Sequence, residues 1–109
     1  NGALDNAAGA ATLIEVARAF ATGPRPRRSL LVVANTAEEK GLLGAEYFAH
    51  YPTVPIAQIT AAIDLDMPML LYDFTDAVAY GSTHSTLDAV FAKAGAAMGV
   101  TISPDPMPE

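Results

Sequence analysis

Acidic side chains occur at three separate points of this 109-residue sequence where chemistry could take place. Asp5 precedes the first expected helix, Glu38 and Glu39 follow an apolar run, and Asp66 follows a second apolar run. In open α/β sheets a ligand binds outside the carboxyl ends of the strands, so acidic residues that follow two parallel strands would lie close together. Carboxylates gathered in one small space repel one another unless a cation neutralises them. The spacing therefore indicates a metal site.

Each of these residues also has a purely structural interpretation. Asp5 could be the N-cap of the helix that follows it, because Asp is favoured there. Glu38 and Glu39 could form a solvated pair in a loop. Asp64 and Asp66 share one side of an extended segment, and one of them could cap a turn. Only oxygen ligands are visible in the pattern, so the residues alone indicate a magnesium or manganese ion.

The elements that would position these residues alternate between helices and strands. Apolar residues recur at helical spacing before Gly23, and long apolar runs are typical of strands that are covered on both faces. The expected helices cover residues 6–22, 41–50 and 85–98, and the expected strands cover residues 29–35, 57–65 and 78–80. The Pro-rich segment 103–108 predicts an extended loop. This order of elements is typical of an α/β domain.

Composition excludes several kinds of partner and site. Acidic residues outnumber basic ones by 12 to 6, so the surface could not neutralise the phosphates of a nucleic acid. Arg25, Arg27 and Arg28 are expected in a solvated Pro-rich loop. The absence of cysteine excludes disulfides and thiolate metal sites. No apolar run approaches the roughly 20 residues that span a bilayer, so we expect no membrane partner. The charge balance likewise predicts no nucleic-acid partner.

Three segments around the acidic residues resemble the co-catalytic di-zinc aminopeptidases, the bacterial leucyl aminopeptidase and aminopeptidase Y type of zinc exopeptidase. Residues 2–9, GALDNAAG, are similar to the family motif G-x-x-D-N-x-S-G. Residues 36–45, TAEEKGLLGA, resemble its E-E-x-G-L-x-G-S, and residues 63–67, IDLDM, resemble its N-x-D-M. The resemblance implies a three-layer αβα zinc-exopeptidase (phosphorylase/hydrolase-like) fold with a mostly parallel mixed sheet. Residues 1–109 would form only part of that catalytic domain.

The resemblance also implies a role for each acidic residue. Asp5 would bridge two zinc ions, Glu39 would bind one of them and Asp66 the other. Glu38 would be the general base, which takes a proton from the water between the ions and transfers it to the departing amine. The peptide bond after Asp5 is often cis in this family. The residues alone indicate only that one of the two adjacent glutamates binds metal while the other faces the water.

The sequence departs from the family pattern at several positions. Ala8 stands in place of Ser and Asp64 in place of Asn, although neither position is a ligand in the family. The family also uses two histidine ligands, and neither His50 nor His84 matches them. His50 is expected at the end of a helix, and His84 in a loop that caps a helix, with a pocket wall as its alternative. The chain would thus hold three of five ligands, bind zinc weakly and be inactive by itself.

These features predict a metal-dependent exopeptidase that removes N-terminal residues from a peptide substrate. The resemblance also implies a periplasmic or secreted location. The alternatives are a non-catalytic receptor or scaffold of the same fold, a glutaminyl cyclase with one zinc ion, and a magnesium-dependent phosphohydrolase. The complete acidic set favours an enzyme, because a scaffold does not need it. Exposed sheet edges would favour a homo-oligomer formed by pairing between copies.

Overall fold

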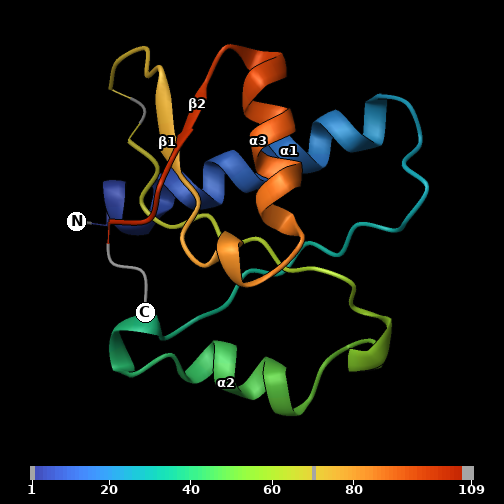
Figure 1. Cartoon of the computed structure of the whole chain (residues 1–109). Helices are drawn as coiled ribbons and strands as arrows, with labels where there is room; N and C mark the ends of the chain where they lie inside the picture. The colour runs from blue at the N-terminus through green and yellow to red at the C-terminus, as the bar shows by residue number, and fades with distance from the viewer. Residues whose placement is uncertain (1, 70, 107–109) are drawn as a thin grey trace. The chain divides into compact units, whose positions relative to one another are not determined.

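The computed structural model describes residues 2–69 and 71–106, which belong to two compact units, residues 1–69 and residues 70–109. The first unit contains α1 (Gly9–Thr22), α2 (Leu43–His50) and the short helical segments Ala3–Ala8, Glu38–Lys40 and Ile56–Gln58. The second unit contains β1 (Asp76–Val78), the short helical segment Ser82–His84, α3 (Leu87–Met98) and β2 (Thr101–Ser103), all shown in Figure 1.

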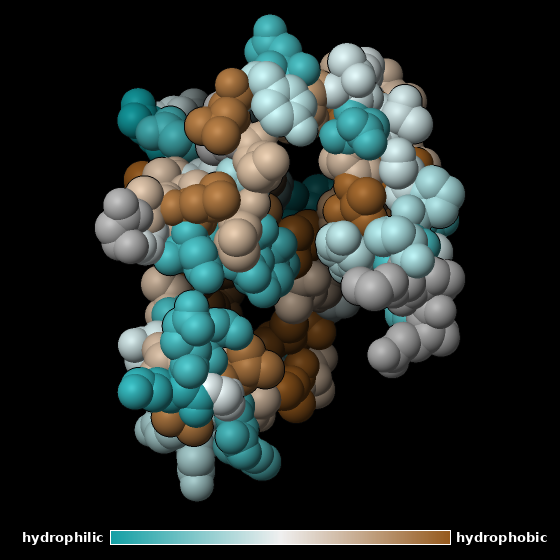
Figure 2. All heavy atoms as spheres, turned by 90° about the vertical axis from the view of Figure 1, so that its left-hand side faces the viewer, coloured by the Kyte–Doolittle hydropathy of each residue, from teal (hydrophilic) through white to brown (hydrophobic). Residues whose placement is uncertain are grey.

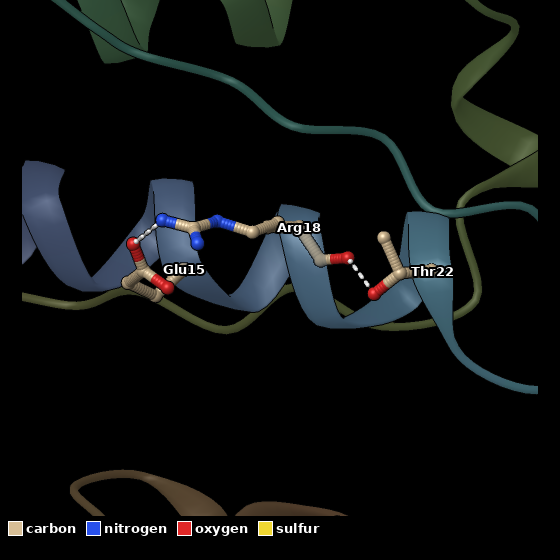
Figure 3. A network of polar contacts seen from close by, with 3 residues as sticks. All are labelled: Glu15, Arg18 and Thr22. Atoms are coloured by element: carbon tan, nitrogen blue, oxygen red, sulfur yellow. Dashed lines mark hydrogen bonds and ion pairs between the residues drawn. The ribbon is translucent and has the colours of Figure 1, made fainter.

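Helix α1 has a half-buried apolar side, as its sequence predicts, although its apolar residues Ile14 and Phe20 are exposed. Its half-buried apolar residues are Leu13, Val16 and Ala17. On the exposed side, Arg18 Nη2 lies 2.7 Å from Glu15 Oε1, and Thr22 Oγ1 donates a hydrogen bond of 2.9 Å to the Arg18 carbonyl (Figure 3). The helix ends before Gly23, whose backbone is extended. It begins at Gly9 rather than at Asn6, because the backbone of Asn6 is not helical.

The second unit is built around a parallel strand pair that α3 connects. β1 and β2 pair in the register Asp76 to Thr101, Ala77 to Ile102 and Val78 to Ser103 (Figure 1). Gly95 allows α3 to approach this pair, because a Cβ atom there would lie 2.5 Å from the Val100 carbonyl oxygen. Gly99 ends α3 in the left-handed conformation with φ 71°. The predicted end of this helix at Gly99 is confirmed.

Two of the predicted strands do not form. Residues 29–35 and 57–65 contain no strand, and residues 56–58 form a helical turn instead. A strand is held by the N–H and C=O groups of a neighbouring strand, and the described residues offer neither run such a neighbour. The strand expected at 78–80 lies at 76–78. The predicted loop 103–108 begins inside β2, and residues 107 and 108 lie outside the described residues.

The described residues contain no buried hydrophobic side chain. Figure 2 shows hydrophobic side chains on the surface next to polar ones. Leu30 and Leu31, in the middle of a predicted buried strand, are 49% and 46% exposed. The combination of helices with a two-stranded parallel sheet confirms the predicted α/β class. The described residues do not form the three layers of the expected fold. Among these residues, no helix has the length and apolar character needed to cross a membrane.

Candidate metal centre

Asp5 lies in the irregular turn that precedes α1. Its backbone (φ −107°, ψ 99°) and that of Asn6 (φ −129°, ψ 46°) are not helical, and the peptide bond between them is cis, as the resemblance implies. The Asp5 side chain is exposed and forms no hydrogen bond or ion pair with any described residue. The capping role considered for Asp5 belongs to Asn6, whose Oδ1 accepts the N–H of Gly9 at 2.9 Å. The Asp5 carboxylate is thus free to bind a ligand.

The Asn6 side chain joins this turn to the segment that carries Asp66. Asn6 Nδ2 donates a hydrogen bond of 3.0 Å to the Leu65 carbonyl, and the Met67 N–H donates one of 3.1 Å to Asn6 Oδ1. These partners are 59 and 61 residues away in the sequence. Asp66 lies between them and is exposed, with no hydrogen-bond partner among the described residues. The structure therefore brings together the chain segments of two predicted ligands.

Glu38 and Glu39 begin a single helical turn that is closed by backbone hydrogen bonds. The N–H groups of Gly41 and Leu42 donate to the Glu38 carbonyl at 2.9 and 2.8 Å. The Gly44 N–H donates to the Thr36 carbonyl at 3.0 Å, which fastens the start of this loop to α2. Both glutamate side chains are exposed, and neither forms an ion pair with a described residue. Their carboxylates are also free.

Backbone conformations of low population lie next to these same segments. Ala37 (φ 58°), Leu42 (φ 60°) and Met67 (φ 47°) are the non-glycine residues with positive φ in the described parts of the chain. Ala37 directly precedes Glu38, and Met67 directly follows Asp66. Such conformations are uncommon outside glycine and cluster at functional sites, where the surrounding structure enforces them. Their positions agree with a functional role for both acidic segments.

The four carboxylates do not form a ready-made metal site. Within residues 2–69 and 71–106, no group of three or more histidine, aspartate or glutamate side chains is arranged to hold a metal ion. No hydrogen bond among the described residues links the Glu38–Glu39 segment to Asp5 or Asp66. The described residues thus do not bring the Glu38–Glu39 segment into one metal-binding group with Asp5 and Asp66. The roles of all four carboxylates remain predictions, as do the two histidine ligands of the family that neither His50 nor His84 matches.

The two histidines lie where the sequence predicts. His50 is the last residue of α2 and is exposed. His84 ends the turn before α3 and is also exposed. After that turn, the N–H of Leu87, the first residue of α3, donates to Ser85 Oγ at 3.2 Å. The buried Ser82 donates from its Oγ to Asp88 Oδ1 of α3 at 3.0 Å. The prediction that this loop caps a helix is confirmed.

The sequence matches the model of peptidase family M28 over residues 1–109. The chain belongs to peptidase family M28. It is 42% identical over 52 residues to a vacuolar membrane protease of Verticillium alfalfae, a match that covers 47% of this chain and 5% of that protein. It is 39% identical over 66 residues to a probable zinc metalloprotease of Pyrenophora tritici-repentis, covering 61% of this chain and 15% of that protein. A vacuolar membrane protease of Yarrowia lipolytica is 39% identical over 66 residues, with 60% and 6% covered.

Family membership supports a peptidase but does not single out the bacterial aminopeptidase type. The matched segments span only 5% to 15% of the length of these curated relatives. No solved structure matches the chain. The prediction of a periplasmic or secreted location is wrong, because three of the relatives, among them those of Verticillium and Yarrowia, are named vacuolar membrane proteases. A magnesium-dependent phosphohydrolase is not supported either, since the family is one of peptidases.

Proposed function

We propose that the full-length protein is a zinc-dependent exopeptidase that removes N-terminal residues from peptides. In this proposal Asp5, Glu39 and Asp66 are metal ligands and Glu38 is the general base. The observation that carries it is that Asp5 and Asp66 are free carboxylates on two segments that Asn6 holds together. The rest of a three-layer α/β/α domain, with two histidine ligands, would complete the site.

The donor set of the chain fits zinc. Aspartate and glutamate oxygens bind zinc, and catalytic zinc sites combine a carboxylate with histidines and leave one position open. None of the predicted ligands is engaged by a described lysine or arginine, so a cation would not have to displace a salt bridge. When bound, a pair of zinc ions would lower the pKa of the attacking water and polarise the scissile carbonyl. The name of the Pyrenophora relative also favours zinc.

Glu38 and Glu39 would divide the remaining work. Glu39 would bind metal, and Glu38 would accept a proton from the attacking water and transfer it to the departing amine. The turn Glu38–Lys40 holds both residues close to α2 through the bond from Gly44 to Thr36. A short closed turn limits how far the two carboxylates can move, which suits a base that must reach one particular water.

The test of the base is Glu38→Gln in the full-length protein. This change keeps the size of the side chain and removes its ability to accept a proton. We expect kcat to fall by about 100-fold or more, since general-base catalysis contributes roughly 10²–10⁴-fold. Bound zinc, measured by atomic absorption, should stay at the wild-type level. The matched control is Glu46→Gln, an exposed glutamate in the first turn of α2. Full activity of Glu38→Gln would overturn the assignment.

The test of the ligand is Glu39→Ala. We expect this variant to lose bound zinc together with activity, because the carboxylate would be a direct ligand. Loss of zinc in Glu38→Gln and not in Glu39→Ala would mean that the two roles are exchanged. A full-length protein that binds zinc but hydrolyses no peptide would favour the receptor or scaffold alternative.

Exopeptidase activity is tested with a pair of peptides. A peptide with a free N-terminal amine and the same peptide with an acetylated N-terminus differ only in the group that an aminopeptidase must recognise. We expect hydrolysis of the peptide with the free N-terminus alone. Mass spectrometry of the released residues measures it. Cleavage of both peptides at internal bonds would exclude the exopeptidase assignment while leaving the metal site unaffected.

A further inference from the structure

We propose that Asn6 is a positioning residue whose carboxamide fixes the spacing between Asp5 and Asp66. This inference rests on the proposed function, because the two carboxylates matter only if both bind metal. Asn6 follows Asp5 directly in the sequence, and its side chain contacts the residues on both sides of Asp66. Any displacement of the carboxamide would therefore change the position of both proposed ligands.

The three hydrogen bonds of Asn6 require an amide in one orientation. Oδ1 accepts two N–H groups, from Gly9 at 2.9 Å and from Met67 at 3.1 Å. Nδ2 donates to the Leu65 carbonyl at 3.0 Å. A carboxylate would place an oxygen against the Leu65 carbonyl oxygen, and an aliphatic side chain would lose all three bonds. The residue type is thus specified by its contacts with a segment about 60 residues away.

Gly9 makes this junction close enough to form. A Cβ atom at position 9 would lie 2.1 Å from the Leu65 carbonyl oxygen and 2.3 Å from Asn6 Oδ1. Both distances are far below van der Waals contact, so no other residue fits without moving the two segments apart. Gly9 is buried, although Asn6 is exposed. The N-terminus of α1 and the Leu65 carbonyl therefore pack directly against each other at the point that Asn6 bridges.

A purely structural alternative is that Asn6 only caps α1. Its bond to the Gly9 N–H is the bond by which a capping residue satisfies a free amide of the first helical turn. Serine caps helices about as well as asparagine, but its shorter side chain cannot reach Leu65 and Met67 at the same time. Asn6→Ser therefore keeps the cap and removes the junction, whereas Asn6→Ala removes both.

The experiment measures zinc affinity of the full-length protein by competition with a chromogenic chelator. It is repeated with Co²⁺, whose visible spectrum reports ligand geometry. We expect both Asn6→Ser and Asn6→Ala to bind zinc about 10–100-fold more weakly and to change the Co²⁺ spectrum, as when residues that orient metal ligands are removed. Gly9→Ala should do the same. The control is Gln58→Ala, an exposed amide whose side chain has no hydrogen-bond partner among the described residues.

Zinc affinity and a Co²⁺ spectrum of Asn6→Ser equal to those of wild type would overturn the proposal, because capping alone would then be sufficient. If circular dichroism shows that Asn6→Ala does not fold, the zinc affinity and the Co²⁺ spectrum of Asn6→Ser decide between positioning and capping. If neither variant folds, the role of Asn6 is in folding, and the proposal is overturned. Absence of zinc binding in the wild-type protein would overturn the proposed function itself. Wild-type binding with unchanged Asn6 variants would overturn the positioning role alone.

Discussion

At the scale of single residues, neighbouring carboxylates of the same chemistry have different surroundings. Asp64 and Asp66 are both exposed and are separated only by Leu65. The hydrogen bonds of Asn6 reach the carbonyl before Asp66 and the amide after it, and Met67 adds a positive φ immediately beyond. Asp66 is therefore held on both sides, whereas none of these bonds involves Asp64 directly. This difference supports the proposal that Asp66, and not Asp64, is the metal ligand.

The matched pair Asp66→Asn and Asp64→Asn tests that assignment. We expect Asp66→Asn to weaken zinc binding by at least about 100-fold, more than the loss of an orienting residue would cause, because a neutral amide replaces an anionic ligand. Asp64→Asn should keep zinc affinity and kcat/KM within about twofold of wild type. Isothermal titration of the apo proteins with zinc measures the affinities, and steady-state assays of the zinc-loaded proteins measure kcat/KM. Equal losses in the two variants would contradict the distinction and indicate a general effect of negative charge.

At the scale of elements, the sequence predicted the features that depend on residues close together along the chain. The helices follow from apolar residues three and four apart and from Gly23 and Gly99, which are signals within one or two turns. The strands at 29–35 and 57–65 were wrong, because an apolar run does not itself provide the neighbouring strand. β2 could not be predicted, since three residues beside a Pro-rich segment pair with β1 only after α3 has returned the chain.

The candidate site shows the same limit. The acidic residues could be identified because each lies in a short motif, and their roles stay predictions. The role of Asn6 could not be found from the sequence, because two of its three bonds join it to residues 59 and 61 positions away. The signal that was available is its place directly after Asp5 in the motif. A motif identifies a residue at a position, but it does not show which distant backbone groups the side chain of that residue contacts.

The loop that carries the two glutamates depends on a small residue in α2. A Cβ atom at Gly44 would lie 2.3 Å from the Thr36 carbonyl oxygen and 2.6 Å from its nitrogen. Alanine improves helix propensity by at most about 1 kcal/mol, but overpacking costs about 1–3 kcal/mol. We expect Gly44→Ala to displace the Glu38–Glu39 turn and to lower kcat by about tenfold or more, since small misplacements of catalytic groups are costly.

The control for Gly44→Ala is Gly95→Ala, which crowds α3 against the Val100 carbonyl in the other unit. Gly95→Ala should lower the melting temperature about as much as Gly44→Ala does, because the steric conflict is similar. Its kcat per folded molecule should stay at the wild-type value. Equal kcat losses in both variants, measured well below their melting temperatures, would show that Gly44 acts through stability alone.

At the scale of the whole molecule, many large hydrophobic side chains of the described residues are exposed. The described residues contain no buried hydrophobic side chain, and Leu30, Leu31 and Val32 are all nearly half exposed. A folded domain normally covers such a run, and an uncovered one favours association. The proposed three-layer domain would cover the run with helices on both faces. Residues 29–35 should then favour association of the isolated chain, whereas in the full-length protein they should be buried and stabilise the fold.

Leu31→Lys tests this expectation in both proteins. In the isolated 109-residue chain the new charge should reduce self-association, measured by light scattering at equal concentration, because the run becomes less apolar. In the full-length protein it should lower the free energy of unfolding by at least about 2 kcal/mol, since a buried leucine is lost and a charge must be accommodated. The control, Gln58→Lys, adds the same charge at an exposed polar position and should change neither quantity appreciably. An unchanged unfolding free energy of full-length Leu31→Lys would mean that residues 29–35 stay uncovered there, and the three-layer arrangement would then be wrong.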